Sequence, residues 1–95
     1  MNQSIFKYVL ENTDRQKIIM PQNARILCVQ PQNGKPCIWA IVKAFQPNEE
    51  REFEIYGTGN PFYENAHYGK ETTYIGTYQL SDIGFVGHLF ELVKI

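Results

Sequence analysis

The residues of this chain best suited to ligand chemistry lie in one stretch, FEIYGTGNPFYENAHYG, at positions 53–69. Backbone amides at Gly57 and Gly59 could bind a phosphate, as they do in nucleotide-binding loops. A P-loop requires Lys-Ser/Thr after its last glycine, and a dinucleotide fingerprint requires G-x-G-x-x-G at the start of a helix. Here Asn60-Pro61-Phe62 follows, with no helical pattern beyond it. We therefore do not expect an enzymatic phosphate loop.

Two interpretations of this stretch remain, a turn and a binding loop. Glycine at a strand end followed by proline is typical of a turn. Glycine amides beside several aromatic rings could also recognise a nucleobase or a small nucleotide. A connection of about fifteen residues in so small a domain is more often functional than idle. The candidate ligand-binding residues are Tyr56, Gly57, Thr58, Gly59, Asn60, Phe62, Tyr63 and His67.

Catalytic and metal-binding patterns are weak in the rest of the chain. A nucleophile needs a histidine within hydrogen-bond reach and a third group that orients it. Of the two histidines, His67 lies in the loop stretch and His88 in an apolar run typical of a core or interface residue. Zinc requires three or four compactly spaced ligands, which Cys28, Cys37 and two distant histidines do not supply. We expect no enzyme, no metal and no cofactor.

An acidic run occupies positions 49–54. It contains Arg51 and four carboxylates, those of Glu49, Glu50, Glu52 and Glu54. Carboxylates at this density are typical of a solvated strand face or hairpin, with Arg51 and Lys35 near enough to balance their charge. We interpret the run as a solvent-facing surface.

Seven short apolar or β-branched runs are separated by segments rich in Asn, Pro, Gly or Asp. No window holds a sustained 3.6-residue period. The sequence therefore predicts a single all-β domain over residues 1–95, a small antiparallel sandwich or partly open barrel of about seven strands. The expected strands are Ile5–Leu10, Gln16–Met20, Arg25–Gln30, Cys37–Ala44, Arg51–Tyr56, Thr72–Leu80 and Phe85–Lys94.

The segment ILCVQPQNGKPCIWAIV gives the most detailed structural prediction. Asn33-Gly34 favours a type I′ hairpin turn, which pairs Gln30 with Cys37, Cys28 with Trp39 and Ile26 with Ile41. Both faces of this hairpin are then apolar, whereas a hairpin with one solvated face would alternate. We expect a second subunit to cover one face. With the apolar run FVGHLFELVKI, this predicts a homo-oligomer with interface residues Cys28, Trp39, Ile41, His88 and Phe90.

The same register makes Cys28 and Cys37 diagonal neighbours, with Cα atoms roughly 7–8 Å apart. That separation is too long for a comfortable disulfide, so we expect reduced thiols and a cytoplasmic protein. The N-terminal apolar run contains Lys7 and no small-residue cleavage site, so no signal peptide is expected. No apolar stretch reaches the roughly 18–20 residues of a membrane span.

Composition narrows the choice of partners. Nine basic residues against ten acidic ones give a net charge of −1, whereas a protein that binds duplex nucleic acid needs a clustered basic excess. We therefore expect no duplex nucleic acid partner. Aromatic residues make up 14% of the chain, which leaves rings available for an interface.

Several segments together resemble a family of short, uncharacterised proteins found mainly in bacteriophages and in bacterial genomes that carry phage remnants. The distinctive pieces are Asn33-Gly34-Lys35-Pro36, Trp39-Ala40, Ile55-Tyr56-Gly57-Thr58-Gly59 and His88-Leu89-Phe90-Glu91. The resemblance covers nearly the whole chain. It implies a phage-type accessory protein that acts in the host cytoplasm, and it implies no catalytic residues.

Two function classes follow from these observations. The first is a non-enzymatic, homo-oligomeric binding protein that antagonises a host defence function, either by sequestering a nucleotide-derived signal near residues 57–69 or by binding a host protein through exposed rings. The second is a structural or assembly protein of the virion, which would use the same apolar β surfaces without a pocket.

Overall fold

The computed structural model describes residues 3–95, and strands are its main secondary structure. All seven predicted strands are present, each with its ends moved by a few residues at most. No helix within residues 3–95 is long and apolar enough to cross a membrane; the helical segment described is a 3₁₀ turn, Ser81–Ile83. The strands are β1 (Gln3–Val9), β2 (Arg15–Pro21), β3 (Arg25–Gln32), β4 (Lys35–Lys43), β5 (Asn48–Gly57), β6 (Lys70–Leu80) and β7 (Phe85–Lys94).

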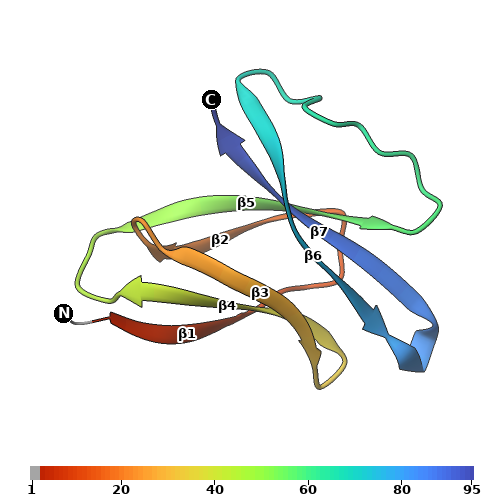
Figure 1. Cartoon of the computed structure of the whole chain (residues 1–95), viewed down its shortest axis with the longest axis horizontal. Helices are drawn as coiled ribbons and strands as arrows, with labels where there is room; N and C mark the ends of the chain where they lie inside the picture. Colours follow the sequence, from red (N-terminus) through yellow and green to blue (C-terminus); the bar gives the residue numbers. More distant parts are fainter. Residues whose placement is uncertain (1–2) are drawn as a thin grey trace.

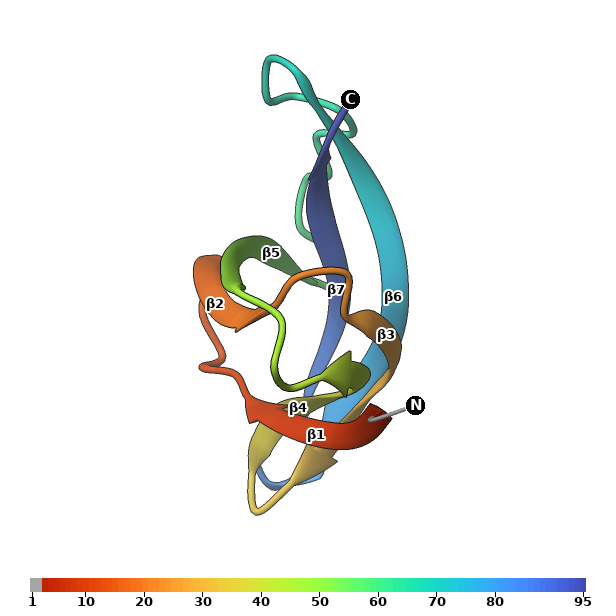
Figure 2. The same cartoon turned by 90° about the vertical axis from the view of Figure 1, so that its left-hand side faces the viewer.

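The strands form two sheets that pack as a sandwich (Figure 1). The three-stranded sheet has the order β1-β4-β3, and the four-stranded sheet has the order β2-β5-β7-β6. All neighbouring strands are antiparallel. The sheets do not close into a barrel. Seen from the side, the β6–β7 pair continues beyond the sandwich as a two-stranded ribbon (Figure 2).

The β3–β4 hairpin confirms most of the predicted register. Asn33 and Gly34 have φ values of 53° and 77°, the left-handed backbone that a type I′ turn requires. Gln30 pairs with Cys37, and Cys28 pairs with Trp39. Beyond that point the prediction is wrong, because a β-bulge between Ile26 and Cys28 pairs Ile26 with Ala40.

The bulge changes which side chain of β3 faces the core. Leu27 is the extra residue, and its side chain is 44% exposed. Ile26 turns inward and packs against the buried cluster. A bulge inserts one residue into a strand and reverses the alternation of faces on its far side.

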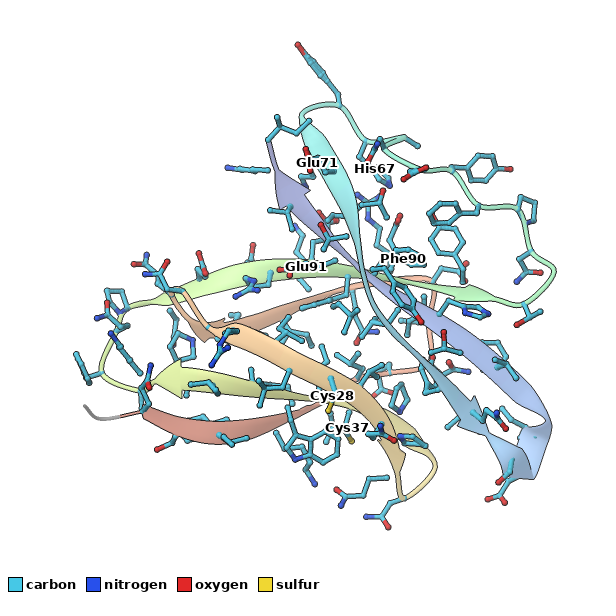
Figure 3. All side chains as sticks on the ribbon, viewed as in Figure 1. Cys28, Cys37, His67, Glu71, Phe90 and Glu91 are labelled. Carbon is cyan, nitrogen blue, oxygen red and sulfur yellow. The ribbon has the colours of Figure 1, made fainter. Side chains whose placement is uncertain are left out.

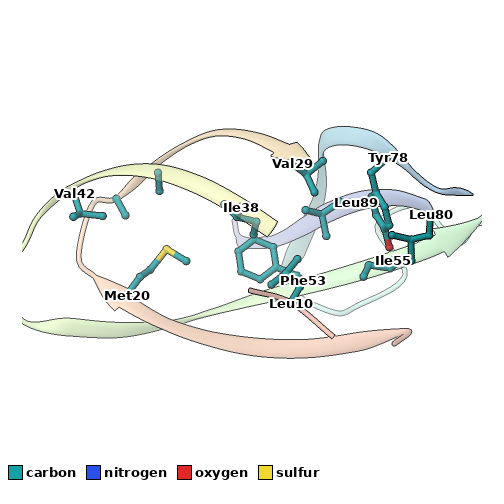
Figure 4. Close-up of a cluster of buried hydrophobic side chains, with 12 residues drawn as sticks. Leu10, Met20, Val29, Ile38, Val42, Phe53, Ile55, Tyr78, Leu80 and Leu89 are labelled. Atoms are coloured by element: carbon teal, nitrogen blue, oxygen red, sulfur yellow. The ribbon is translucent and has the colours of Figure 1, made fainter. Parts of the chain in front are cut away.

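One apolar core fills the space between the two sheets (Figure 4). Its largest fully buried members include Phe53, Leu10, Met20, Ile38 and Leu89. Both sheets contribute side chains to this core.

Tyr78 shows how tightly the core is packed. Its ring lies where a Cβ on Gly87 would come within 2.4 Å of Cζ, so β7 needs glycine at that position. Its hydroxyl donates to Asn12 Oδ1 at 2.8 Å. Burial raises the pKa of Tyr78 to about 12, because the ionised phenolate would lose its hydration.

A bidentate ion pair between Arg51 and Glu91 ends the core on the side where the ribbon leaves the sandwich. Arg51 Nη2 lies 3.1 Å from Glu91 Oε1, and Arg51 Nε contacts the other carboxylate oxygen. Arg51 Nη1 also donates to the backbone carbonyl of Ala24 at 2.9 Å. The hydrogen bond to Glu91 raises the pKa of Arg51 against the opposing effect of burial. The pair therefore links β5, β7 and the start of β3.

Breaking this pair should cost far more stability than breaking an exposed pair. The side chains of Arg51 and Glu91 are 17% and 10% exposed, so Arg51→Met leaves a buried carboxylate uncompensated and should lower the free energy of unfolding by about 3 kcal/mol. Lys35→Met is the matched control, since Lys35 and Glu11 pair in solvent at 3.0 Å, and it should cost less than about 1 kcal/mol. Urea denaturation of both variants measures the difference. Equal losses would show that the buried pair has no special role.

Candidate functional site

The long loop between β5 and β6, residues 58–69, folds back onto the outer face of the four-stranded sheet (Figure 3). Phe62 anchors its first half. The ring of Phe62 lies 4.8 Å from the ring of Tyr56 and 4.8 Å from that of Phe90. Tyr74 extends the group, with its ring 5.3 Å from Phe90. These four residues form the aromatic cluster of the outer face.

The glycine stretch at the start of this loop is a turn. The amide of Asn60 donates to the carbonyl of Gly57 at 3.1 Å, and the amide of Thr58 donates to Val86 at 3.2 Å. Gly59 has a φ of +90°, which side chains with a Cβ rarely adopt. A Cβ on Gly57 would lie 3.0 Å from the Asn60 side chain. The amides of Thr58 and Asn60, the residues that follow the two glycines, are therefore already bound to backbone carbonyls.

A row of hydroxyl groups joined by one imidazole borders the aromatic cluster. Thr58 Oγ1 lies 2.7 Å from His88 Nε2, and Thr77 Oγ1 lies 3.0 Å from His88 Nδ1. Tyr74 Oη lies 2.6 Å from Thr77 Oγ1. With Thr58 donating to Nε2, the Nδ1 proton is donated to Thr77. His88 is thus half-buried and hydrogen-bonded, as predicted, and its partners are hydroxyls that sequence reasoning did not identify.

This row resembles a nucleophile–base pair without the group that would activate it. In a catalytic triad a carboxylate at the second imidazole nitrogen stabilises the charge of the imidazolium. Here the group at that nitrogen is the neutral hydroxyl of Thr77. The arrangement orients His88 and offers hydrogen bonds to a ligand.

His67 anchors the second half of the loop. Its Nε2 lies 2.8 Å from Glu54 Oε2, and Arg15 Nη2 lies 3.3 Å from its Nδ1. With Arg15 donating to Nδ1, the Nε2 proton is donated to Glu54. Tyr56 donates its hydroxyl to the other oxygen of Glu54 at 3.0 Å, and its pKa is raised by burial and by that carboxylate. One carboxylate on β5 therefore holds both the loop and the aromatic cluster.

The interpretation of residues 49–54 as a solvated surface is wrong for its second half. Glu52 and Glu54 are largely buried, with side chains 13% and 10% exposed. Glu52 contacts Lys70, and Arg15 Nε lies 2.7 Å from its Oε2. The hydrogen bond from Lys70, followed by that from Arg15, holds the pKa of Glu52 below its ordinary value despite burial. Lys35, expected to balance this run, pairs with Glu11 instead.

Three of the predicted ligand residues meet around one hollow of the surface. It has a volume of about 280 Å³. Tyr56, Asn60 and Tyr63 line it together with Arg15, Asp14, Glu54, Ile55 and Pro61. Phe62 contacts Tyr56 of the lining, and His67 contacts Arg15 and Glu54. Thr58 contacts His88, which does not line the hollow. Asp14 and Arg15 were not predicted here, because they lie at the start of β2, far from the loop in sequence. Glu54 lies two residues before Tyr56 and was expected in a solvated acidic run.

The predicted interface residues do not share one surface. Cys28, Trp39 and Ile41 lie on the outer face of the three-stranded sheet, whereas His88 and Phe90 lie on the outer face of the four-stranded sheet. Both cysteines are free thiols, as the register predicted. Within residues 3–95, no three His, Cys, Asp or Glu side chains come together in a group that could hold a metal ion.

A family model described as a domain of unknown function, DUF7352, matches residues 1–94, so the chain belongs to that family. No curated protein and no solved structure matches the chain.

Removing the Phe62 ring should release the loop and leave the sandwich intact. Phe62→Ala deletes two aromatic pairs, each worth about 0.5–1.5 kcal/mol, so amide hydrogen exchange in residues 60–67 should accelerate by roughly tenfold or more. Exchange in β4 should not change. Tyr68→Ala is the control, since Tyr68 is 92% exposed on the same loop. A loop that exchanges at the same rate in both variants would contradict this anchoring role.

Glu52 should show a low pKa that depends on Lys70. Because the folded pKa lies below the unfolded value of about 4.3, the carboxylate stabilises the fold above that value, and this contribution is lost as pH falls through the folded pKa. Lys70→Met should raise the pKa of Glu52, and Arg15→Met should raise it less. Carboxyl-detected NMR titration measures both effects, with Lys35→Met as the control. An unchanged pKa in Lys70→Met would refute the assignment.

Proposed function

We propose that this member of a family of unknown function is a non-enzymatic binding protein that assembles as a homo-oligomer and sequesters a small nucleotide-derived ligand. In line with its resemblance to phage proteins, it would act in the host cytoplasm and antagonise a host defence signal. The observation that carries the proposal is the convergence of Tyr56, Tyr63, Asn60 and Arg15 on one hollow.

The chemistry of these side chains suits a nucleotide. Tyr63 is 63% exposed and offers a ring on which a base can stack. The side chain of Arg15 is 43% exposed and can bind a phosphate oxygen through its remaining donors. Asn60 offers an amide that both donates and accepts hydrogen bonds. Ring, cation and amide are the three groups that a base with a phosphate requires.

The size of the hollow supports assembly. Ligand pockets usually enclose about 300–1,000 Å³, and this one holds about 280 Å³. Tyr74 and Phe62 are 57% and 43% exposed beside it, next to His88 and Phe90 of the predicted interface. A second subunit packed on this aromatic cluster would enclose a ligand that one subunit covers on a single side.

Binding is favoured over catalysis by the state of the polar groups. Glu52 binds both Arg15 and Lys70, and Glu54 binds His67, so neither carboxylate is free to act as a base, and Thr58 lacks an activated base. Such groups orient a ligand without supplying a nucleophile.

Thermal-shift and calorimetric titration with cyclic nucleotides and ADP-ribose derivatives tests ligand binding. A ligand at a hundred times its Kd stabilises the fold by about 2.7 kcal/mol, which for a domain of this size raises Tm by roughly 10–20 °C. Tyr63→Ala should abolish the shift, and Tyr68→Ala should retain it. Absence of a shift with every compound, or equal loss in both variants, would contradict the proposal.

Light scattering on the same samples tests the assembly. A defined oligomer that Tyr74→Asp converts to monomer is expected, whereas a monomer at all concentrations would refute this part. Recovery of the protein in purified virus particles, with no ligand bound, would favour the virion role instead.

A further inference from the structure

The three-stranded sheet contains only positive charges. Its strands hold four basic residues, and all ten acidic residues of the chain lie outside them. The register places all four on the outer face. Lys35 and Lys43 share a face of β4 with Trp39 and Ile41, and Lys7 and Arg25 lie on that same face because they pair with Trp39 and Ile41. The cationic face thus comprises Lys7, Arg25, Lys35 and Lys43, all exposed.

These cations are almost uncompensated. Lys35 is the one member of the four with an ion pair among the described residues, to Glu11, and both partners are exposed. Lys7 donates to the neutral amide oxygen of Gln32. In a chain whose net charge is −1, this face is a local excess of positive potential that attracts anions.

Trp39, the only tryptophan of the chain, lies at the centre of this face. It is half-buried between Lys7 on β1 and Cys28 on β3. Lys35 and Lys43 lie on the same strand, four residues to either side, which at about 3.3 Å per residue places each roughly 13 Å away. Ile5 and Val9 beside it are 61% and 49% exposed. A ring with cations on either side along one strand suits a single-stranded nucleic acid, whose bases can stack on the ring while its phosphates contact the cations.

We propose that the cationic face binds single-stranded nucleic acid, with Trp39 stacking on a base and the four basic side chains contacting phosphates. Sheet faces with an aromatic platform and cations bind single strands in this way, with limited sequence preference. Duplex nucleic acid keeps its bases stacked inside, so Trp39 would gain nothing from it. This function goes beyond the proposed sequestration, since it uses the opposite face of the sandwich.

Other occupants fit this face less well. An acidic protein would satisfy the cations and leave the half-buried ring of Trp39 without a specific role. A second copy of the chain, packed on the same face about a twofold axis, would bring eight like charges together, which is repulsive. The cationic face is therefore a different surface from the aromatic cluster, through which we propose that the homo-oligomer assembles.

The test is fluorescence titration of the wild-type protein with a 12-nucleotide poly-dT strand in low salt. Stacking should quench the emission of Trp39, and the logarithm of the binding constant should fall with the logarithm of salt concentration at a slope of about −2.8, for four phosphates at −0.7 each. Duplex DNA of equal length should bind more weakly. Polyglutamate should not compete as effectively as the oligonucleotide.

Variants separate the contributions of the ring and the cations. Trp39→Leu should weaken binding about tenfold or more, measured by anisotropy of a labelled strand, and Trp39→Phe should recover most of it. Lys43→Gln and Arg25→Gln should each reduce the magnitude of the salt slope by about 0.7. Lys94→Gln, on the other sheet, is the control and should leave it unchanged. Thermal unfolding of each variant verifies the fold.

Three results would overturn the inference. They are no binding to the strand in low salt, equal binding to duplex and single strand with no change in Trp39 emission, and equal weakening by Lys94→Gln. Loss of nucleotide binding by Tyr63→Ala would not affect this titration, so the two proposals can fail independently.

Discussion

The Arg51–Glu91 ion pair is the contact on which the arrangement of the whole molecule depends. β5 pairs with β7 only between Glu52 and Gly57, and beyond that the β6–β7 ribbon diverges from β2 and β5 (Figure 1). The opening left between them has a volume of about 670 Å³ and is lined largely by charged side chains. An apolar core cannot end at such an opening without meeting water. It ends instead on a desolvated, fully hydrogen-bonded charge pair.

The position of the ribbon then determines the course of the loop. Since β5 ends at Gly57 and β6 begins at Lys70 far along the ribbon, the connection has to cross the outer face of the four-stranded sheet. It is held there by a ring at Phe62, by His67 on Glu54 and by Lys70 on Glu52. The partners of these anchors, Phe90, Glu54 and Glu52, lie on strands β7 and β5. The residues that line the hollow are therefore positioned by the sheet, although several of them belong to the loop.

The strands were predictable because each is bounded by turn residues, and Asn33-Gly34 set the hairpin register. Two features were not. The bulge at Leu27 leaves no mark in the sequence, because Ile26 and Leu27 are equally apolar and either can face inward. The burial of Glu52 and Glu54 depends on Arg15 and on Lys70, which lie on other strands. Local sequence patterns cannot predict that a carboxylate is buried when its partners come from tertiary contacts. Local patterns also do not show which strands share a sheet, and for that reason the predicted interface residues lie on two different outer faces.

The two outer faces of the sandwich differ in how their charges are arranged, and this difference distinguishes their roles. On the four-stranded sheet, carboxylates and cations lie in contact and compensate one another; the ligand that we propose for this face would be selected by rings and directed hydrogen bonds. On the three-stranded sheet, four basic side chains surround Trp39 and only Lys35 among them has an ion pair in the described residues, with Glu11, so their mutual repulsion opposes folding. A face that served only to cover the core would not need such a cluster. The same repulsion opposes the packing of two such faces against each other, which is consistent with the self-association that we propose through the aromatic cluster.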